Sequence, residues 1–321
     1  MNGHFIGMRL PILGREDNFA AKKDMRHCVF IVFLFYVWSM SAQGYVSYDH
    51  FSSSTLRDDA GNRFGAGSMS MMSVGYGVPL SRNVDDMGKA VMWTAAFGCD
   101  YAVLDNMGQA SQMNPDEVVN AGINVTHVRP ISAKWNLLAT VGTGMYAPVN
   151  EISSKSWLFN GGVVFICDCN RNISLGIGGG VTNSFGVPMA MPMLYLSWRK
   201  KGQFEFHIDM SSKIKISALT NVWRNLTVEL SALDIDGLTA VMKIDGREQI
   251  YSMMMLNSYI KPSYAFSPKC SVFAVVGGCW IRGISVTERS LKGFFNGFKD
   301  DNDDPYFQAA LRLSAGVRFS F

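Results

Sequence analysis

Apolar side chains occupy alternate positions through residues 307–321, the last segment of the chain. Leu311 and Leu313 are two of these apolar residues. Arg312 and Arg318 occupy two of the alternate polar positions of the segment. Successive side chains of a β-strand point to opposite faces, so a strand with one apolar face repeats every two residues. The segment therefore predicts one long amphipathic strand.

The same period runs through residues 203–218, where Phe206 and Ile208 share one parity and charged residues share the other. The phase continues across Ser211 and Ser212, so we predict a single strand over 203–219. Shorter alternating stretches cover residues 139–145, 173–182 and 225–232.

Two architectures fit this alternation: a soluble β-sandwich with its apolar faces inward and a transmembrane barrel with its apolar face outward. Several predicted strands have about 14–16 residues, whereas sandwich strands usually have about 5–6. Aromatic residues also lie towards strand ends, as in the girdles of membrane barrels. We therefore predict an all-β, antiparallel, up-and-down transmembrane β-barrel of about 12–14 strands, with a periplasmic sandwich as the alternative. The aromatic residues are Tyr146, Trp157, Trp198, Trp223, Tyr306 and Phe321.

Composition agrees with a membrane barrel. Hydrophobic residues make up 48% of the chain and charged residues only 17%, whereas soluble domains usually carry about 25% charged residues. After residue 43 there is no uncharged apolar run of the roughly 18 residues that a membrane helix needs. The net charge of +3 gives little electrostatic basis for binding nucleic acid.

Residues 25–43 have the features of a signal peptide. An apolar run from Cys28 to Trp38 precedes the small residues of Ser39-Met40-Ser41-Ala42, which is the order that signal peptidase requires. We predict cleavage after Ala42 or Gln43. The segment 1–24 is either an extended basic region or lies upstream of the true start at Met25. Residues 1–43 are thus assigned to a leader, and residues 44–321 to the barrel domain.

We place fourteen strands in the barrel domain, an even number that puts both ends on one side of the membrane. Short connections such as 168–171 would face the periplasm, and longer ones such as 104–117 and 285–304 would face outward. The strands at 45–53 and 238–245 alternate least clearly, so twelve strands remain possible. The full set is 45–53, 66–79, 89–103, 118–129, 132–147, 155–167, 172–184, 190–200, 203–219, 224–233, 238–245, 250–265, 269–284 and 305–321.

No metal site or disulfide framework is predicted. Five cysteines follow the leader, and an odd number at irregular spacing is not typical of a disulfide scaffold. The Cys167-Asp168-Cys169 sequence lacks a nearby histidine or second cysteine pair, so it does not predict a zinc site. Four aspartates within 300–304 do not follow EF-hand spacing, and we interpret them as a solvated loop.

The ending ALRLSAGVRFSF resembles the C-terminal strand of Gram-negative outer-membrane barrels. That resemblance implies that Phe321 is the signal read by the barrel assembly machinery. The stretches RPISAKWNLLATVGTGMYA, NISLGIGGGVTNSFGVPMAMPMLYLSW and FAVVGGCWIRG resemble an uncharacterised family of outer-membrane β-barrel proteins from Bacteroidetes, over roughly residues 65–321. The resemblance implies an outer-membrane location, with lipid and lipopolysaccharide as partners, and it implies no activity or cofactor.

The polar parity of the strands predicts which side chains line the lumen. The leading function is a narrow pore for passive transport of a small solute, since fourteen strands leave room for a channel. The alternative is a closed lumen with a structural or surface-binding role. A lipid-modifying enzyme is less favoured, because His207 and Ser211 would face the lumen about 13 Å apart; no catalytic residue is assigned. The predicted lumen residues are Glu205, His207, Asp209, Lys213, Lys215, Glu229, Arg312 and Arg318.

Overall fold

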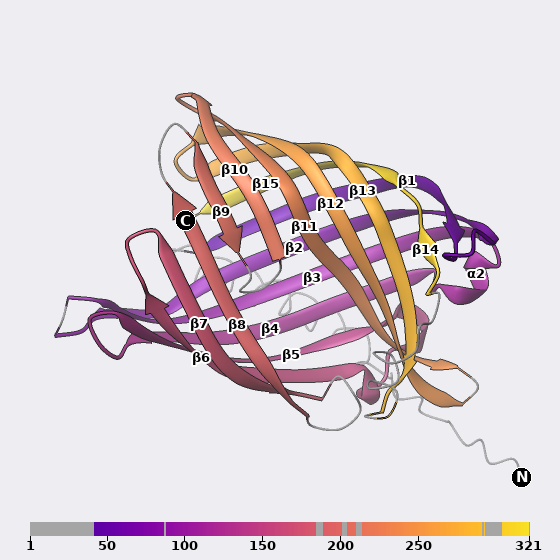
Figure 1. The fold of residues 1–321 in the computed structure, drawn as a ribbon, viewed down its shortest axis with the longest axis horizontal. Coiled ribbons are helices and arrows are strands. Elements are labelled where there is room, and N and C mark those ends of the chain that lie inside the picture. The colour runs from indigo at the N-terminus through magenta and orange to yellow at the C-terminus, as the bar shows by residue number, and fades with distance from the viewer. Residues whose placement is uncertain are drawn as a thin grey trace, which may run out of the picture. The chain divides into compact units, whose positions relative to one another are not determined.

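The computed structural model describes residues 42–320, apart from 87, 184–188, 201–203, 210–213, 245, 291 and 293–303. In this part of the chain every strand belongs to one antiparallel sheet, in which consecutive strands pair with each other except for the last two. The sheet closes because β1 also pairs with β15 (Figure 1). The strands are β1 (Gln43–Arg57), β2 (Arg63–Val84), β3 (Ala90–Gly108), β4 (Glu117–Pro130), β5 (Trp135–Pro148), β6 (Trp157–Asp168), β7 (Ile173–Thr182), β8 (Met189–Lys200), β9 (Glu205–Asp209), β10 (Ile214–Trp223), β11 (Leu226–Ile244), β12 (Arg247–Ser267), β13 (Cys270–Glu288), β14 (Tyr306–Phe307) and β15 (Ala310–Ser320).

The short β14 and the longer β15 form one interrupted strand, since both lie between β1 and β13. Counted this way, the described residues form a closed barrel of 14 strands. The prediction of an all-β, antiparallel, up-and-down barrel is confirmed. The connections contain a short helix, α2 (Ala110–Met113), and two 3-10 turns, η1 (Val149–Glu151) and η2 (Ser154–Ser156). None of the described helices is long and apolar enough to span a bilayer.

The single strand predicted over 203–219 is wrong. The structure has a hairpin there, in which β9 pairs with β10 and Ile208 lies opposite Ile216. Every pair in this ladder joins two residues of the same parity, because the two residue numbers of each pair add to an even sum. Side chains of one parity therefore stay on one face through the reversal, and the alternation shows no break at the turn.

The two strands predicted at 224–233 and 238–245 are also wrong, because β11 is continuous. The ladder between β11 and β12 shifts register between Ser231 and Asp234. Such a β-bulge adds a residue to one strand and exchanges the faces of the residues that follow. Leu230 is accordingly exposed on the outer face, whereas Leu238 is buried inside. One predicted strand is thus two strands in the structure, and two predicted strands are one. The two errors offset each other in the count, so the predicted total of fourteen strands was correct.

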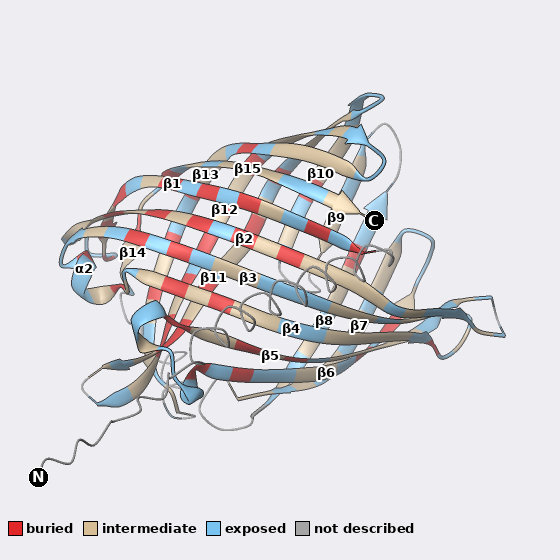
Figure 2. Cartoon of the chain, turned by 180° about the vertical axis from the view of Figure 1, so that it is seen from behind, coloured by how far each residue is buried: buried red, intermediate tan, exposed pale blue. Residues whose placement is uncertain are grey.

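The outer face of the barrel is apolar along most strands. Its exposed side chains include Leu311 and Leu313 on β15, Ile177 on β7 and Leu194 on β8. Buried positions run instead along the inner face, most densely on β1, β2, β12 and β13 (Figure 2). Exposed leucine and isoleucine in such number are typical of a surface that contacts lipid rather than water.

Buried apolar residues fill the lumen at the end that carries the longer connections, here called the loop end. We call this group the apolar plug. It draws on eight neighbouring strands and on α2, and it contains four methionine side chains on inward positions of β2 and β12. Its members are Phe51, Leu56, Met69, Met71, Ala102, Leu104, Ala110, Val118, Leu238, Ala240, Tyr251, Met253, Met255, Cys279, Ile284 and Phe307.

The lumen narrows at the loop end because β11 leaves its neighbour β10 and crosses towards β4 and β5. Among the described residues, pairing with β10 reaches no further along β11 than Ile235, and β11 contacts β4 and β5 beyond it. When the side-chain amide of Asn120 is rotated so that its oxygen and nitrogen exchange places, its nitrogen donates to Thr239 O at 2.6 Å. Its oxygen then accepts from Thr239 N at 3.2 Å. At this level the strands from β11 through β15 and on from β1 to β4 surround the plug. Eight strands enclose a space that side chains can fill.

Candidate functional site

A chamber of about 500 Å³ lies in the lumen next to the apolar plug, on the side of the barrel where β1 begins and β15 ends. Met71 belongs to both the plug and the chamber wall, so the two spaces adjoin. Charged groups of both signs line the chamber, together with three aromatic rings. Its lining residues are Tyr45, Ser47, Asp49, Met71, Ser73, Asp100, Lys215, Asp234, Asp236, Gly237, Tyr259, Lys261, Phe273, Val275, Arg312, Ser314 and Arg318.

Arg312 is the most enclosed cation of the chamber wall, with a side chain only 11% exposed. Its Nη2 and Nε donate to Asp49 Oδ1 at 2.7 and 3.0 Å. The guanidinium also lies 5.4 Å from the Phe51 ring centre and 5.1 Å from that of Tyr259. Its buried Nη1 has no hydrogen-bond partner among the described residues, so this nitrogen remains available to a bound group.

Glu229 joins two lysines of the chamber wall. Its Oε1 lies 2.5 Å from Lys215 Nζ, and its Oε2 lies 3.9 Å from Lys261 Nζ. Lys261 Nζ also lies 4.5 Å from the centre of the Phe273 ring. Adjacent strands position these groups, because Glu229 lies opposite Lys261 in the β11–β12 ladder.

The predicted lumen residues fall into two groups. Lys215, Arg312 and Arg318 line the chamber, and Glu229 binds Lys215 from the neighbouring strand. A second group lies on β9, where His207 Nε2 is 3.2 Å from Glu205 Oε1 and Asp209 lies opposite Lys215 in the ladder. Lys213 and Phe321 lie outside the described residues, as does most of the acidic segment 300–304.

Sequence reasoning missed five of the eight charged residues that line the chamber. Asp49 lies on β1, whose alternation is weak because a register shift follows Phe51. Asp234 and Asp236 lie directly after the bulge in β11, where a count from Leu230 gives the wrong face. Lys261 and Tyr259 lie on β12 at positions of inward parity. Counting parity along that strand could have identified both as lumen residues.

Within the plug, one cation is buried among apolar groups. The side chain of Arg282 is almost fully buried, and its Nη2 donates to Ser54 Oγ at 2.9 Å and to Gly67 O at 2.8 Å. Its guanidinium lies 4.4 Å from the centre of the Phe307 ring. These contacts tie β13 to β1 and β2 across the narrowed end.

The connection between β3 and β4 covers the plug. Tyr251 of β12 donates its hydroxyl to Asn114 Oδ1 at 2.7 Å inside the barrel. Asn114 Nδ2 in turn donates to Ala110 O at 2.8 Å. Nearby, Asp58 closes the turn between β1 and β2, and the side-chain hydrogen bond from Asn62 lowers the pKa of Asp58. At the loop end, the β1–β2 and β3–β4 connections are thus held by specific hydrogen bonds.

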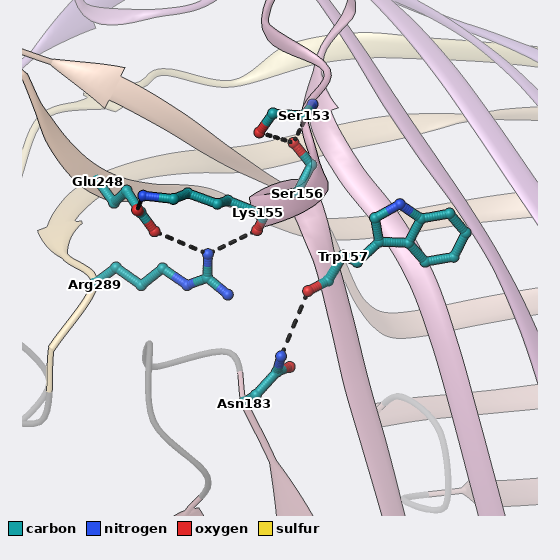
Figure 3. A network of polar contacts seen from close by, with 7 residues as sticks. All are labelled: Ser153, Lys155, Ser156, Trp157, Asn183, Glu248 and Arg289. Atoms are coloured by element: carbon teal, nitrogen blue, oxygen red, sulfur yellow. Dashed lines mark hydrogen bonds and ion pairs between the residues drawn. The ribbon is translucent and has the colours of Figure 1, made fainter.

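A set of ionic contacts, which we call the loop latch, ties η2 to β12 and β13 (Figure 3). Arg289 Nη1 donates to Lys155 O at 2.7 Å and to Glu248 Oε2 at 3.2 Å. Lys155 forms an ion pair with Glu248. On the other side of η2, Asn183 accepts from Phe159 N at 2.6 Å. The latch therefore fixes the β5–β6 connection over the loop end.

The described residues include no group of three or more histidine, cysteine or acidic side chains that could hold a metal ion. The five cysteines after the leader are free thiols. Ser211, the serine considered with His207 for catalysis, lies outside the described residues.

A family model covers residues 38–320 of the chain, and its description is "Domain of unknown function (DUF6268)". The chain belongs to this family. The matched range contains all the strands of the barrel. Among curated proteins, none matches the chain.

Solved structures that resemble the barrel of this DUF6268 protein include a channel, a transporter and a porin. The COG4313 outer membrane channel from Pseudomonas putida F1 shares 11% identity at a TM-score of 0.43, over 88% of this chain and 96% of the channel. The P. putida toluene transporter TodX shares 7% identity at 0.35, over 87% and 89%. The KdgM porin, solved with oligogalacturonate, shares 9% at 0.27, over 86% and 99%. At these scores, nothing that these proteins bind is transferred to this chain.

Proposed function

We propose that this chain is an outer-membrane barrel that binds a small organic anion in its chamber and passes it across the membrane, with the apolar plug as the gate. The observation that carries the proposal is the chamber itself, a space of about 500 Å³ inside a closed barrel. Its volume suits a small solute, and charged side chains that line a lumen set its selectivity.

The preference for an anion rests on two arginines. Arg318 lines the chamber and forms no hydrogen bond or ion pair with the described residues. Arg312 keeps one buried nitrogen without a partner, although its others bind Asp49. A carboxylate or sulfonate could accept from both, because guanidinium donors match such groups in geometry and charge.

The lengths of the connections support an orientation in the membrane. Those on the terminal side, such as 131–134 and 224–225, are short, and those on the other side, such as 109–116 and 149–156, are longer. Bacterial barrels have short periplasmic turns and longer outer loops. Gln43 and Ser320, where β1 begins and β15 ends, therefore face the periplasm in this proposal, and the loop latch faces outward.

Processing and assembly belong to the same proposal. A signal peptide ending near Ala42-Gln43 would deliver the chain to the periplasm, and N-terminal sequencing of the mature protein would read Gln43 or Gly44 first. Phe321 would be read by the barrel assembly machinery, and the outer face would contact lipid and lipopolysaccharide. We also infer a Bacteroidetes origin from the sequence stretches that resemble that family.

A closed barrel with a structural or surface-binding role is the second candidate. The plug and the loop latch favour it, because both close the lumen at the loop end. The two functions differ in one measurable property. A structural barrel has no use for a solute site, whereas the proposed carrier must bind an anion in the chamber.

The test is calorimetric titration of propanesulfonate into the barrel in lipid nanodiscs, with empty nanodiscs as the blank. The wild type should bind, and Arg318→Gln should weaken binding about tenfold, since a hydrogen bond to a charged group is worth about 1.5–3 kcal/mol. Arg199→Gln is the matched control, because Arg199 lies outside the chamber lining. Absence of binding, or equal effects of the two variants, would favour the structural role.

A further inference from the structure

Two serines lie side by side on the chamber wall formed by the neighbouring strands β15, β1 and β2 (Figure 1). Ser47 of β1 lies directly opposite Ser73 of β2 in the ladder, and the Cβ atoms of such paired residues are about 4.5–5.5 Å apart. Both residues line the chamber. Their side chains therefore present two neighbouring hydroxyls to the same part of the lumen.

Both hydroxyls are enclosed by the wall and open to the chamber. Ser47 is only 8% exposed and Ser73 only 6%, and neither side chain forms a hydrogen bond with the described residues. Neither oxygen belongs to the fully enclosed side-chain atoms that lack a partner, so both oxygens keep accessible surface. A solute that displaces water from such hydroxyls must bring hydrogen-bonding groups of its own, or it loses affinity. The wall thus disfavours a solute that is apolar beyond its anionic group.

The ladder between β1 and β15 places this hydroxyl pair between the two arginines of the chamber. Arg318 lies opposite Tyr45, and Arg312 lies opposite Phe51. Inward positions of a strand follow one another every two residues, or about 6.6 Å. Along β1, Arg318 is thus one inward position before Ser47, and Arg312 is two positions after it. An anionic group at Arg318 and hydrogen-bonding groups at the serines therefore fit within one small molecule.

The ring of Tyr45 adds an apolar surface beside the hydroxyl pair. Gly75 lies opposite Tyr45 in the β1–β2 ladder, and a side chain at position 75 would overlap the Tyr45 ring. The ring therefore lies across β2 in the space that the glycine leaves, and it lines the chamber. An aromatic face offers apolar contact to the C–H groups of a sugar ring. Sugar hydroxyls both donate and accept hydrogen bonds, as serine hydroxyls do.

We propose that the solute of the chamber is a sugar acid, a monosaccharide that carries a carboxylate. The carboxylate accepts from Arg318, two hydroxyls bind Ser47 and Ser73, and one face of the sugar ring packs against Tyr45. This inference rests on the proposed function, because it assigns a substrate class to the same chamber. It goes further in requiring hydroxyl groups, which a simple alkyl anion lacks.

The first test compares three solutes by calorimetric titration into the wild-type barrel in lipid nanodiscs, after subtraction of empty nanodiscs. Glucuronate carries the carboxylate and the hydroxyls. Cyclohexanecarboxylate has a six-membered ring and the carboxylate without hydroxyls, and glucose has the hydroxyls without the carboxylate. Glucuronate should bind at least about tenfold more tightly than either of the other two, because each of those leaves polar groups of the wall without a partner.

The second test removes the two hydroxyls from the wall. Ser47→Ala combined with Ser73→Ala should bring the affinities for glucuronate and cyclohexanecarboxylate close to each other. Ser70→Ala is the matched control, because Ser70 lies on β2 outside the chamber lining, with its hydroxyl 3.0 Å from His50 Nδ1. The control should keep the wild-type preference for glucuronate. Urea unfolding in lipid vesicles would confirm that each variant is folded.

The outcomes separate the inference from the function on which it rests. A preference for glucuronate that the double variant loses and the control keeps supports the sugar acid. If cyclohexanecarboxylate binds as tightly as glucuronate, or if the double variant keeps the preference, the inference is wrong and the anion site stands. Glucose binding as tightly as glucuronate would contradict both. If neither propanesulfonate nor glucuronate binds, the proposed function itself fails.

Discussion

Neighbouring positions on β15 meet opposite surroundings, and this difference can be tested by two matched substitutions. Leu313 is exposed on the outer face, while Ser314 lines the chamber. An arginine on the lipid face near the bilayer centre costs about 2–4 kcal/mol. Leu313→Arg should therefore lower folding stability in urea titrations into lipid vesicles far more than Ser314→Arg. Equal losses would mean that the assignment of the two faces is wrong.

The pair formed by Arg312 and Asp49 gives a second residue-scale prediction. Both side chains are largely enclosed, at 11% and 6% exposure. Removing one partner of a buried ion pair leaves an uncompensated charge and costs about 3–5 kcal/mol. Arg312→Gln and Asp49→Asn should each destabilise the barrel, and the double variant should lose less than the sum. Urea unfolding of the four proteins measures this coupling, and simple additivity would refute it.

At the residue scale, the sequence alone identified the cations that line the chamber better than the acidic residues that pair with them. Arg312 and Arg318 lie in an uninterrupted alternation, so their face could be counted from Leu311 or Leu313. Asp234 lies just after a bulge, and a count along the chain cannot show where the extra residue enters. The ion pair between Arg312 and Asp49 joins the first and last strands, which no local pattern reveals.

At the scale of elements, alternation located strands well and their ends poorly. Same-parity pairing in the β9–β10 ladder leaves no break in the pattern, so one strand was predicted where two exist. The bulge in β11 breaks the pattern without ending the strand. Both errors have one cause: the two-residue period reports which face a side chain takes, and it does not report the direction in which the chain runs.

The loop latch is the element-scale feature most open to experiment. The Arg289 side chain is only 7% exposed and binds both η2 and β12. Arg289→Met should keep much of the packing and free the β5–β6 connection. Amide hydrogens over residues 152–156 should then exchange faster with deuterium. Arg247→Met, at the start of β12, is the control and should leave that exchange unchanged; similar rates in both variants would show that the latch does not hold the connection.

At the scale of the whole molecule, the strand number was predictable and the shape of the lumen was not. Fourteen strands suggest an open channel, and the predicted pore followed from that number. The structure narrows because β11 turns from β10 towards Asn120 on β4. That turn depends on contacts between segments more than one hundred residues apart in sequence, and the alternation of each strand is the same with or without it.

The narrowing leads to a prediction for ion conduction through the whole barrel. Tyr251 and Met253 are among the largest fully buried side chains of the plug, and Tyr251 also binds Asn114 beneath the β3–β4 connection. The wild type should conduct poorly in planar bilayers, because these side chains fill the axial path. Tyr251→Ala combined with Met253→Ala should raise the conductance, although each substitution costs roughly 2–5 kcal/mol of stability. Urea unfolding would confirm that the variant is folded before recording.

The charge of the chamber should then decide which ion passes through the opened barrel. Arg318→Glu in the Tyr251→Ala, Met253→Ala background should move the reversal potential in a salt gradient towards cations, since rings of charge set selectivity. Leu313→Ala in the same background is the control, because it changes the outer face of the same strand and should leave the potential unchanged. A folded double variant that stays silent would mean that the plug is not the gate. An opened barrel whose selectivity ignores Arg318 would place the ion path outside the chamber.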